Sequence, residues 1–382
     1  MSSKLFVFVV GDIGGAKMIL PVIPLFKKAG VDVEVMADSE GEGYKVLNEA
    51  GVKTYNITEA DVGGTRGVPL EEANLLFIGT CGTANKLERG AAAQYFSQKP
   101  IVLGADGFFN HNRLDWREAK ADYWFAITEE HTIDIRRRRP NLAPDKVLVV
   151  GNPAFDNLPT LYKRKGEVRQ QRRQELGLTD NQILAIWWSQ GTECVLREDV
   201  AYTFESIQCL SCLGRPVMFA AMVHPKVERI RAGYIAEIYK QIETTAIQCR
   251  VDVLPESAVK GKMPFEEFCL AADVIFDITS TEGIKSNILG GPPLIHFAGV
   301  ETRRWFEQDL GLEPPDYLPD VRTGQSFTAN DFIQLAETIR AAVRGNSPLP
   351  REEYLKQCSW QPPTIHNAAE RIAEALLEIG GV

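Results

Sequence analysis

The sequence has no apolar run that approaches the roughly 20 residues of a membrane-spanning helix. Its first apolar run, Leu5–Val10, follows Lys4 directly and ends at Gly11, so it lacks the layout of a signal peptide. We therefore expect a cytoplasmic protein with no transmembrane segment.

Positively charged residues are also fewer than negatively charged ones. The chain has 42 lysines and arginines and 51 aspartates and glutamates, which gives a formal net charge of −9. Such a chain would repel phosphate groups, which argues against a nucleic-acid partner. Two local basic segments, Arg136–Arg139 and Lys163–Arg173, are predicted to be solvated helix faces. An anionic acceptor or a membrane surface could also use them.

Close groupings of metal ligands are missing as well. The seven cysteines are scattered, and Cys209 and Cys212 are the only close pair, with no second pair or histidines at zinc-site spacing. We predict reduced, mostly buried thiols and no metal site. The chain also lacks a dinucleotide-binding G-x-G-x-x-G fingerprint and a Walker loop, and we expect no cofactor.

What the sequence does contain is a regular alternation of short apolar runs and helical segments. At 382 residues the chain is also too long for one typical core. The alternation predicts an α/β fold with parallel sheets covered by helices on both faces. The expected strands are Leu5–Val10, Val31–Met36, Val52–Tyr55, Leu75–Gly79, Ile101–Gly104, Tyr123–Ile127, Val147–Val150, Ile183–Trp188, Val217–Val223, Cys249–Leu254, Val274–Asp277 and Leu294–Phe297. The helices expected between them include Ala16–Ala29 and Pro225–Thr244.

The alternation pauses near Asn152, where a charged, apolar-poor helix follows. We predict an N-terminal Rossmann-like domain over residues 1–160, a linker over 161–180, a C-terminal Rossmann-like domain over 181–362 and a final helix over 363–382. Two doubly wound domains facing a central cleft would bind ligands outside the carboxyl ends of their strands.

The most informative segment is Ala272–His296, where a polar turn links a buried strand to a helix predicted over Ile284–Leu289. Free N–H groups and the positive end of a helix dipole would meet at this turn, which suits a phosphate or diphosphate. The alternative is a turn whose hydroxyls only cap the helix. The turn consists of Ser280, Thr281, Glu282 and Gly283.

Other loops at predicted strand ends are also small, glycine-containing or polar. Gly14 and Gly15 would allow a ligand to approach the backbone closely, and His224 directly follows an apolar strand, where it is better placed for phosphate than for packing. Asp106 could act as a general base or bind a substrate hydroxyl, or it could simply form a turn before Gly107. A further loop of the second domain, assigned with His224 to the diphosphate site, consists of Ser189, Gln190, Gly191 and Thr192.

Taken together, these segments resemble the glycosyltransferase-B superfamily, and within it most of all the non-hydrolysing UDP-N-acetylglucosamine 2-epimerases. The most specific match is the stretch from Gly151 to Asp156, which resembles that family's Gly-Asn-(Pro/Thr)-x-x-Asp motif. Val223-His224-Pro225 is similar to a strand that ends in a phosphate-contacting histidine, and Thr279–Gly283 resembles the donor-diphosphate loop. The resemblance implies that the final helix crosses back onto the first domain.

The chain departs from the epimerase pattern at its acidic residues. Thr80 stands where the family has an acid, and Ala105 aligns with a glutamate of the next loop, which leaves only the neighbouring Asp106. The ribose-binding glutamates of the family align near Lys285–Asn287, and only Glu282 could replace them.

Three functions remain open, and the candidate catalytic residues are Asp106, His111 and Glu129. The first is a metal-independent glycosyltransferase that uses a nucleotide-activated sugar, expected to be UDP-linked, with Asp106 or His111 deprotonating an unknown acceptor. The second is a UDP-N-acetylglucosamine 2-epimerase, which needs two or more acids in its cleft. The third is a non-catalytic nucleotide-binding or assembly subunit with the same fold. Association as a homodimer is left open.

Overall fold

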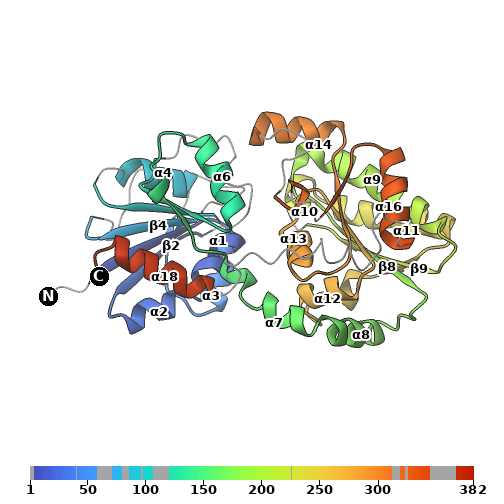
Figure 1. The fold of residues 1–382 in the computed structure, drawn as a ribbon, viewed down its shortest axis with the longest axis horizontal. Helices are drawn as coiled ribbons and strands as arrows, with labels where there is room; N and C mark the ends of the chain where they lie inside the picture. Colours follow the sequence, from blue (N-terminus) through green and yellow to red (C-terminus); the bar gives the residue numbers. More distant parts are fainter. Residues whose placement is uncertain are drawn as a thin grey trace. The chain divides into compact units, whose positions relative to one another are not determined.

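The computed structural model describes residues 4–39, 41–57, 71–79, 86–95, 98–105, 120–224, 226–311, 319–322, 326–344 and 367–382. The chain forms two compact units, each with one sheet flanked by helices (Figure 1). The first unit comprises Met1–Asn157, Asp309–Gly311 and Pro362–Val382, and the second comprises Leu158–Gln308 and Leu312–Gln361.

The first unit contains a seven-stranded sheet in the order β3-β2-β1-β4-β5-β6-β7, and every strand pair in it is parallel. Its strands are β1 (Leu5–Val10), β2 (Asp32–Asp38), β3 (Thr54–Ile57), β4 (Leu75–Gly79), β5 (Ile101–Gly104), β6 (Tyr123–Ala126) and β7 (Val147–Val149). Its helices are α1 (Ile13–Ile19), α2 (Ile23–Lys28), α3 (Glu42–Glu49), α4 (Lys86–Tyr95), α6 (Glu129–Arg138), α18 (Ala368–Ile379) and the short 3₁₀ turns η3 (Pro144–Lys146) and η4 (Pro153–Phe155).

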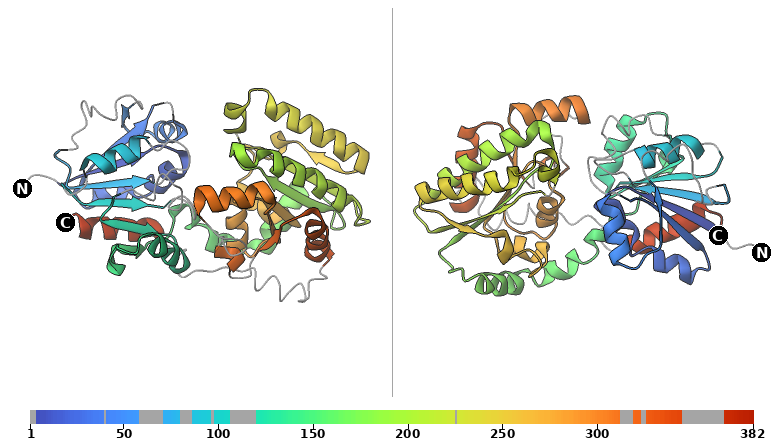
Figure 2. Two further views of the ribbon diagram at one scale, coloured as in Figure 1. Left: turned by 90° about the horizontal axis from the view of Figure 1, so that it is seen from above. Right: turned by 180° about the vertical axis from the view of Figure 1, so that it is seen from behind.

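Helices cover both faces of this sheet, as the doubly wound prediction requires. Alternate residues of a strand point to opposite faces. Phe6 and Phe8 of β1 lie in a core with Phe26 of α2 and Ile372 of α18. Val7 belongs to a second core with residues of α4 and α6. Figure 2 shows the sheet between these two helical layers.

The last helix, α18, packs on the first unit, as the resemblance implied (Figure 1). Its N-terminus is held by Asp156, whose carboxylate accepts hydrogen bonds from the backbone N–H groups of Ala368 (2.8 Å) and Ala369 (3.2 Å). Arg371 adds a hydrogen bond to the carbonyl of Val150. The aspartate of the Gly-Asn-Pro-x-x-Asp stretch is therefore a long-range helix cap.

The second unit contains a six-stranded parallel sheet in the order β10-β9-β8-β11-β12-β13. Its strands are β8 (Ile183–Trp188), β9 (Val217–Met222), β10 (Asp252–Leu254), β11 (Val274–Asp277), β12 (Leu294–Phe297) and β13 (Phe327–Ala329). Its helical elements are α7 (Leu158–Lys163), α8 (Lys165–Glu175), α9 (Glu193–Ser211), α10 (Lys226–Ile230), α11 (Tyr234–Cys249), η5 (Glu256–Ala258), α12 (Phe265–Ala271), α13 (Thr281–Ile288), α14 (Val300–Trp305), α15 (Pro319–Arg322) and α16 (Phe332–Arg344), with a π-helical turn at Phe306–Leu310.

Two helices predicted as single segments are each divided in two. The helix expected over residues 16–29 becomes α1 and α2, because Pro21 and Pro24 lack the N–H that a continuous helix needs. The helix expected over residues 225–244 becomes α10 and α11, with Gly233 between them at a φ of +77°. The predicted linker over 161–180 forms α7 and α8, which are grouped with the second unit.

The basic segment Lys163–Arg173 is only in part the predicted solvated face, because Lys163 and Arg164 are exposed but three further arginines pack against their own unit. Arg169 and Arg173 both form ion pairs with Asp273, and Arg172 pairs with Glu267 of α12. Arg173 is buried. These arginines fasten α8 to its own unit, because a buried aspartate needs opposite charge and hydrogen bonds.

Candidate functional site

The order of the strands in the second unit points to one edge of the sheet. The chain runs from β8 to β9 and β10 on one side and then returns to β11 on the other side of β8. Ligands of open α/β sheets bind outside the carboxyl ends of the strands at such a reversal. Phe276 of β11 is level with Trp187 of β8, so the loops that follow these two strands start side by side. They carry Ser189–Thr192 and Ser280–Gly283.

The loop after β8 is in direct contact with His224, which follows β9. The backbone N–H of His224 donates to Oγ of Ser189 at 2.6 Å. Nδ1 of His224 accepts a hydrogen bond from the N–H of Lys226, so the proton of the neutral imidazole lies on Nε2. A methyl group at Gly191 would lie 2.6 Å from that Nδ1, so only glycine fits beside the ring. The structure therefore unites Ser189, Gly191 and His224.

Asp199 of α9, which was not predicted from the sequence, forms hydrogen bonds that fix the loop after β8. One oxygen of its carboxylate accepts from the indole N–H of Trp187 (2.8 Å) and the other from the N–H of Gln190 (2.7 Å). Burial raises the pKa of Asp199 to about 8 against the lowering effect of these two bonds, and the charge of Asp277 adds to the increase. Asp277 therefore acts electrostatically on Asp199, the residue that binds the loop after β8.

Thr192 lies at the start of α9, and its side chain makes no capping hydrogen bond. The long helix that follows it has 19 residues. The side-chain amide of Gln190 donates to the Thr192 hydroxyl at 3.4 Å, a long contact. The positive end of the α9 dipole therefore faces the loop without a side-chain cap from Thr192.

The turn after β11 is shorter than predicted, because Thr281, Glu282 and Gly283 form the first turn of α13. Ser280 caps this helix by accepting from the N–H of Glu282 at 3.2 Å, so the capping alternative is confirmed for this residue. The N–H of Ser280 donates to Asp277 at 3.0 Å. The side chain of Thr281 is exposed, so its hydroxyl faces solvent at the helix start. Diphosphate binding by this turn stays a prediction.

Glu282 is engaged in an ion-pair cluster rather than standing alone. Nζ of Lys285 lies 2.9 Å from Oε1 of Glu282 and 2.8 Å from Oε1 of Glu266. Although burial alone would lower it, these two carboxylates raise the pKa of Lys285. Lys285 therefore stays charged and compensates the acids next to the first turn of α13.

The predicted site residues of the first unit lie at the corresponding edge of the other sheet. Asp12 caps α1 by accepting from the N–H of Gly15, which is buried against Val10 and Gly79. Gly14 lies one residue earlier in the same helix, and Glu129 is an exposed first residue of α6. Asp106 and His111 lie outside the described residues.

Sequence reasoning could have found two further residues that it missed from one signal, a charged residue within or at the end of an apolar strand. Asp277 ends β11, and His296 lies inside β12. Both are fully buried and bonded to each other. A buried strand position that carries a titratable group must have a partner, because an isolated buried charge is costly.

The described residues show no group of three or more histidine, cysteine, aspartate or glutamate side chains that could hold a metal ion. No described helix is long and apolar enough to cross a bilayer. Five described cysteines form no disulfide, and only one of them, Cys269, is buried, so the expectation of mostly buried thiols does not hold for them. They are Cys194, Cys209, Cys212, Cys249 and Cys269.

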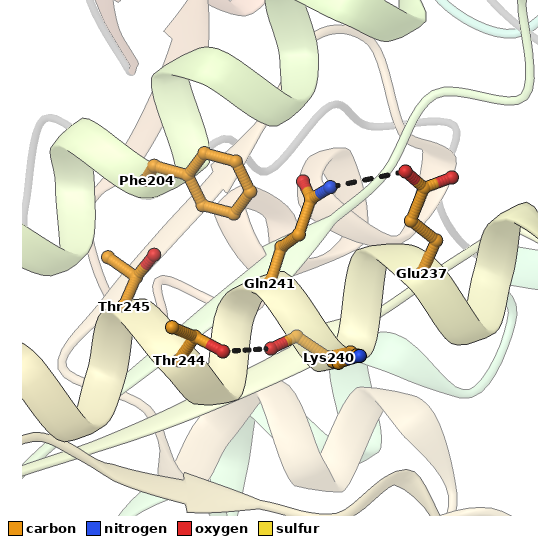
Figure 3. Close-up of a pocket in the computed structure, with 6 residues that line it drawn as sticks. All are labelled: Phe204, Glu237, Lys240, Gln241, Thr244 and Thr245. Atoms are coloured by element: carbon orange, nitrogen blue, oxygen red, sulfur yellow. Dashed lines mark hydrogen bonds between the residues drawn. The ribbon is translucent and has the colours of Figure 1, made fainter.

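A pocket of about 390 Å³ is lined by residues of α9 and α11 (Figure 3). Its polar side chains are bonded along their own helix, with Gln241 donating to Glu237 and the Thr244 hydroxyl to the carbonyl of Lys240. None of the predicted site residues lines it. The lining residues are Phe204, Glu237, Lys240, Gln241, Thr244 and Thr245.

The chain is similar in fold, along nearly its whole length, to solved structures of UDP-GlcNAc 2-epimerases and of a glycosyltransferase. The UDP-GlcNAc 2-epimerase of Neisseria meningitidis, solved with UDP-GlcNAc bound, superposes with a TM-score of 0.65 at 15% identity, over 98% of this chain and 100% of that one. A glycosyltransferase of Rickettsia africae gives 0.58 at 10% identity, over 99% of both chains. HepE of Anabaena, solved with UDP and glucose, gives 0.59 at 15% identity, over 98% and 100%. No family model and no curated protein sequence matches the chain.

Proposed function

We propose that this protein is a nucleotide-sugar enzyme whose second unit binds the nucleoside diphosphate of the donor. The observation that carries the proposal is the placement of two polar loops, Ser189–Thr192 and Ser280–Gly283, on the two strands that flank the chain reversal of the second sheet. Similarity to structures that were solved with UDP or UDP-GlcNAc supports the choice of ligand.

In the proposed complex, groups of both loops would meet the diphosphate. Nε2–H of His224 is a donor held in place by the Nδ1 bond, and the first turns of α9 and α13 direct N–H groups and dipoles toward the same edge. When the bond to the sugar breaks, negative charge grows on the leaving nucleoside diphosphate. Donors that are fixed in advance stabilise that charge, so the proposal requires neither metal nor cofactor.

For the reaction we propose transfer of the sugar to an acceptor hydroxyl. Asp106 or His111 would take the proton of the acceptor, and Glu129 is the third candidate acid or base. The support is the loss of the epimerase acids, since Thr80 stands where that family has an acid and the family's ribose-binding glutamates align near Lys285–Asn287. The engagement of Glu282 by Lys285 leaves one fewer free acid for epimerisation.

Epimerisation at the second carbon of UDP-N-acetylglucosamine is the second candidate. It is favoured by the structural comparisons, among which 2-epimerases give TM-scores as high as the glycosyltransferase does or higher. A non-catalytic nucleotide-binding subunit is the third, since a fold does not determine an activity.

Ligand binding is tested first, by thermal melting of the protein with UDP, GDP, CDP and ADP. A ligand at about 100 times its dissociation constant stabilises the folded state by roughly 2.7 kcal/mol, which is readily measured. The proposal expects at least one nucleotide to raise the melting temperature. No shift with any nucleotide or nucleotide sugar at millimolar concentration would refute it.

The reaction is tested by incubation with UDP-N-acetylglucosamine in heavy water without any acceptor. Transfer needs a second substrate, so we expect no deuterium at the second carbon and no UDP release beyond slow hydrolysis. Incorporation of deuterium above a heat-killed control would establish epimerisation instead. Nucleotide release that appears only with an added acceptor would support transfer.

A further inference from the structure

A chain of three buried ionisable side chains lies beneath the start of α13. Oδ1 of Asp277 is 2.6 Å from Nδ1 of His296, and Nε2 of the same ring is 2.9 Å from Oδ2 of Asp320. All three side chains are essentially inaccessible to water. They come from three elements, the end of β11, the middle of β12 and α15.

Both ring nitrogens of His296 therefore face carboxylate oxygens, and the protonated imidazolium can donate a hydrogen bond to each of them. Burial by itself would lower the pKa of His296, but the charges of Asp277 and Asp320 and their hydrogen bonds raise it to about 10. The ring is a buried imidazolium cation at neutral pH.

This cluster is joined to both ends of α13. At the first turn, Asp277 accepts the N–H of Ser280, and Gly283 packs so closely on the same carboxylate oxygen that a side chain there would collide with it. At the last turn, the side-chain amide of Asn287 donates to Asp320 at 2.8 Å. The charge state of the cluster thus bears directly on the helix that starts at the candidate diphosphate site.

The buried groups near this site would carry too much negative charge without His296. Asp277 and Asp320 are both buried, and Asp277 accepts the N–H of Ser280 directly below the first turn of α13. Carboxylates under the first turn of α13 would oppose the binding of a diphosphate, because charges in a protein interior are poorly screened. One buried cation between two of them removes much of that repulsion.

We propose that His296 is a positioning residue that acts as the buried counter-cation of Asp277 and Asp320, so that an anionic nucleotide can bind at the start of α13. This inference rests on the proposed function and deepens it, because it identifies the buried cation that allows the site to bind a negatively charged diphosphate. Replacing a buried ion cluster by apolar side chains often costs a protein nothing, so stability alone gives no reason for this cluster.

The test is the dissociation constant of UDP for the wild type and three variants, measured by calorimetry at a temperature where each is folded, with uridine as the ligand without phosphate. The cluster carries a net charge of −1 in the wild type, −2 in His296→Gln, 0 in Asp320→Asn and −1 in the double variant. UDP affinity should fall at least about tenfold in His296→Gln, return toward wild type in the double variant, and be kept or improved in Asp320→Asn. Uridine affinity should not follow this order.

Asp273→Asn is the matched control. Asp273 is also buried and ion-paired but precedes β11, at the opposite end of the strand from Asp277. This variant should lose stability and keep its UDP affinity. If His296→Gln does not fold, the UDP affinities of the wild type, Asp320→Asn and the double variant can still be compared with the net charges of their clusters.

If the cluster only stabilises the fold, UDP affinity should fall together with the melting temperature. The wild type would then bind UDP most tightly, and Asp320→Asn would bind it more weakly. That result would overturn the inference while leaving the proposed function in place. Failure of the wild type to bind UDP would overturn both, so the two failures are distinguishable.

Discussion

Gly191 and His224 come from loops that follow two neighbouring strands, and no side chain other than hydrogen fits between them, since a methyl group at Gly191 would lie 2.6 Å from Nδ1 of the imidazole. The same nitrogen accepts a hydrogen bond from the N–H of Lys226, which fixes the ring. The glycine therefore determines where the histidine lies.

Gly191→Ala should displace His224 and weaken nucleotide binding by about tenfold or more, a loss comparable to one hydrogen bond to a charged group. Isothermal calorimetry with UDP measures this. The control is Gly166→Ala in α8, where a methyl group meets nothing within 4 Å. That variant should keep its affinity and gain up to about 1 kcal/mol of stability, because alanine is the better helix former. Equal effects of the two variants would contradict the assignment.

His224→Ala should reduce UDP affinity far more than stability. A hydrogen bond from the imidazole to a phosphate contributes about 1.5–3 kcal/mol, which corresponds to roughly 10- to 150-fold in the dissociation constant. The side chain is exposed, so its removal should shift the melting temperature little. A large loss of stability with unchanged affinity would show that His224 is a structural residue.

Asp156→Ala should destabilise the protein without changing nucleotide affinity, because it removes the cap of α18 in the first unit. Loss of a helix cap costs about 0.5–2 kcal/mol, measured here by denaturant unfolding. Asp156→Asn keeps one acceptor oxygen and should lose less. A clear loss of UDP affinity in either variant would contradict a purely structural role for this residue.

Stability should fall as pH rises through the range in which Asp199 ionises. The pKa of Asp199 is about 8 in the folded protein, against 3.8 as its ordinary value, so between these limits the folded state holds a proton that the unfolded chain has lost. The free energy of unfolding therefore decreases with rising pH over this interval and levels off above it. Asp199→Asn has no such group, so its melting temperature should decline less between about pH 5 and pH 8. Parallel pH profiles for the two proteins would show that Asp199 keeps its ordinary pKa.

The strands and their parallel order could be predicted because continuous apolar runs such as Ile183–Trp188 are required for strands buried on both faces. The same reasoning found Ser189 and His224, since loops at the carboxyl ends of such strands lie at one edge. β13 was not predicted, because three residues of an edge strand carry little pattern. Pro21 and Gly233 mark the two helix breaks in the sequence, but the apolar periodicity on either side of them predicted continuous helices.

The amino-acid sequence by itself determined the alternation of strands and helices, the doubly wound class and the polar character of the strand ends, because these depend on local periodicity and on which residues tolerate burial. Only the tertiary structure decided the partners of the buried charges. Asp156 caps a helix 212 residues away, and His296 joins Asp277 and Asp320 across three elements. Hydrogen bonds and ion pairs depend on distances of a few ångströms, and distances between remote segments exist only once the chain has packed.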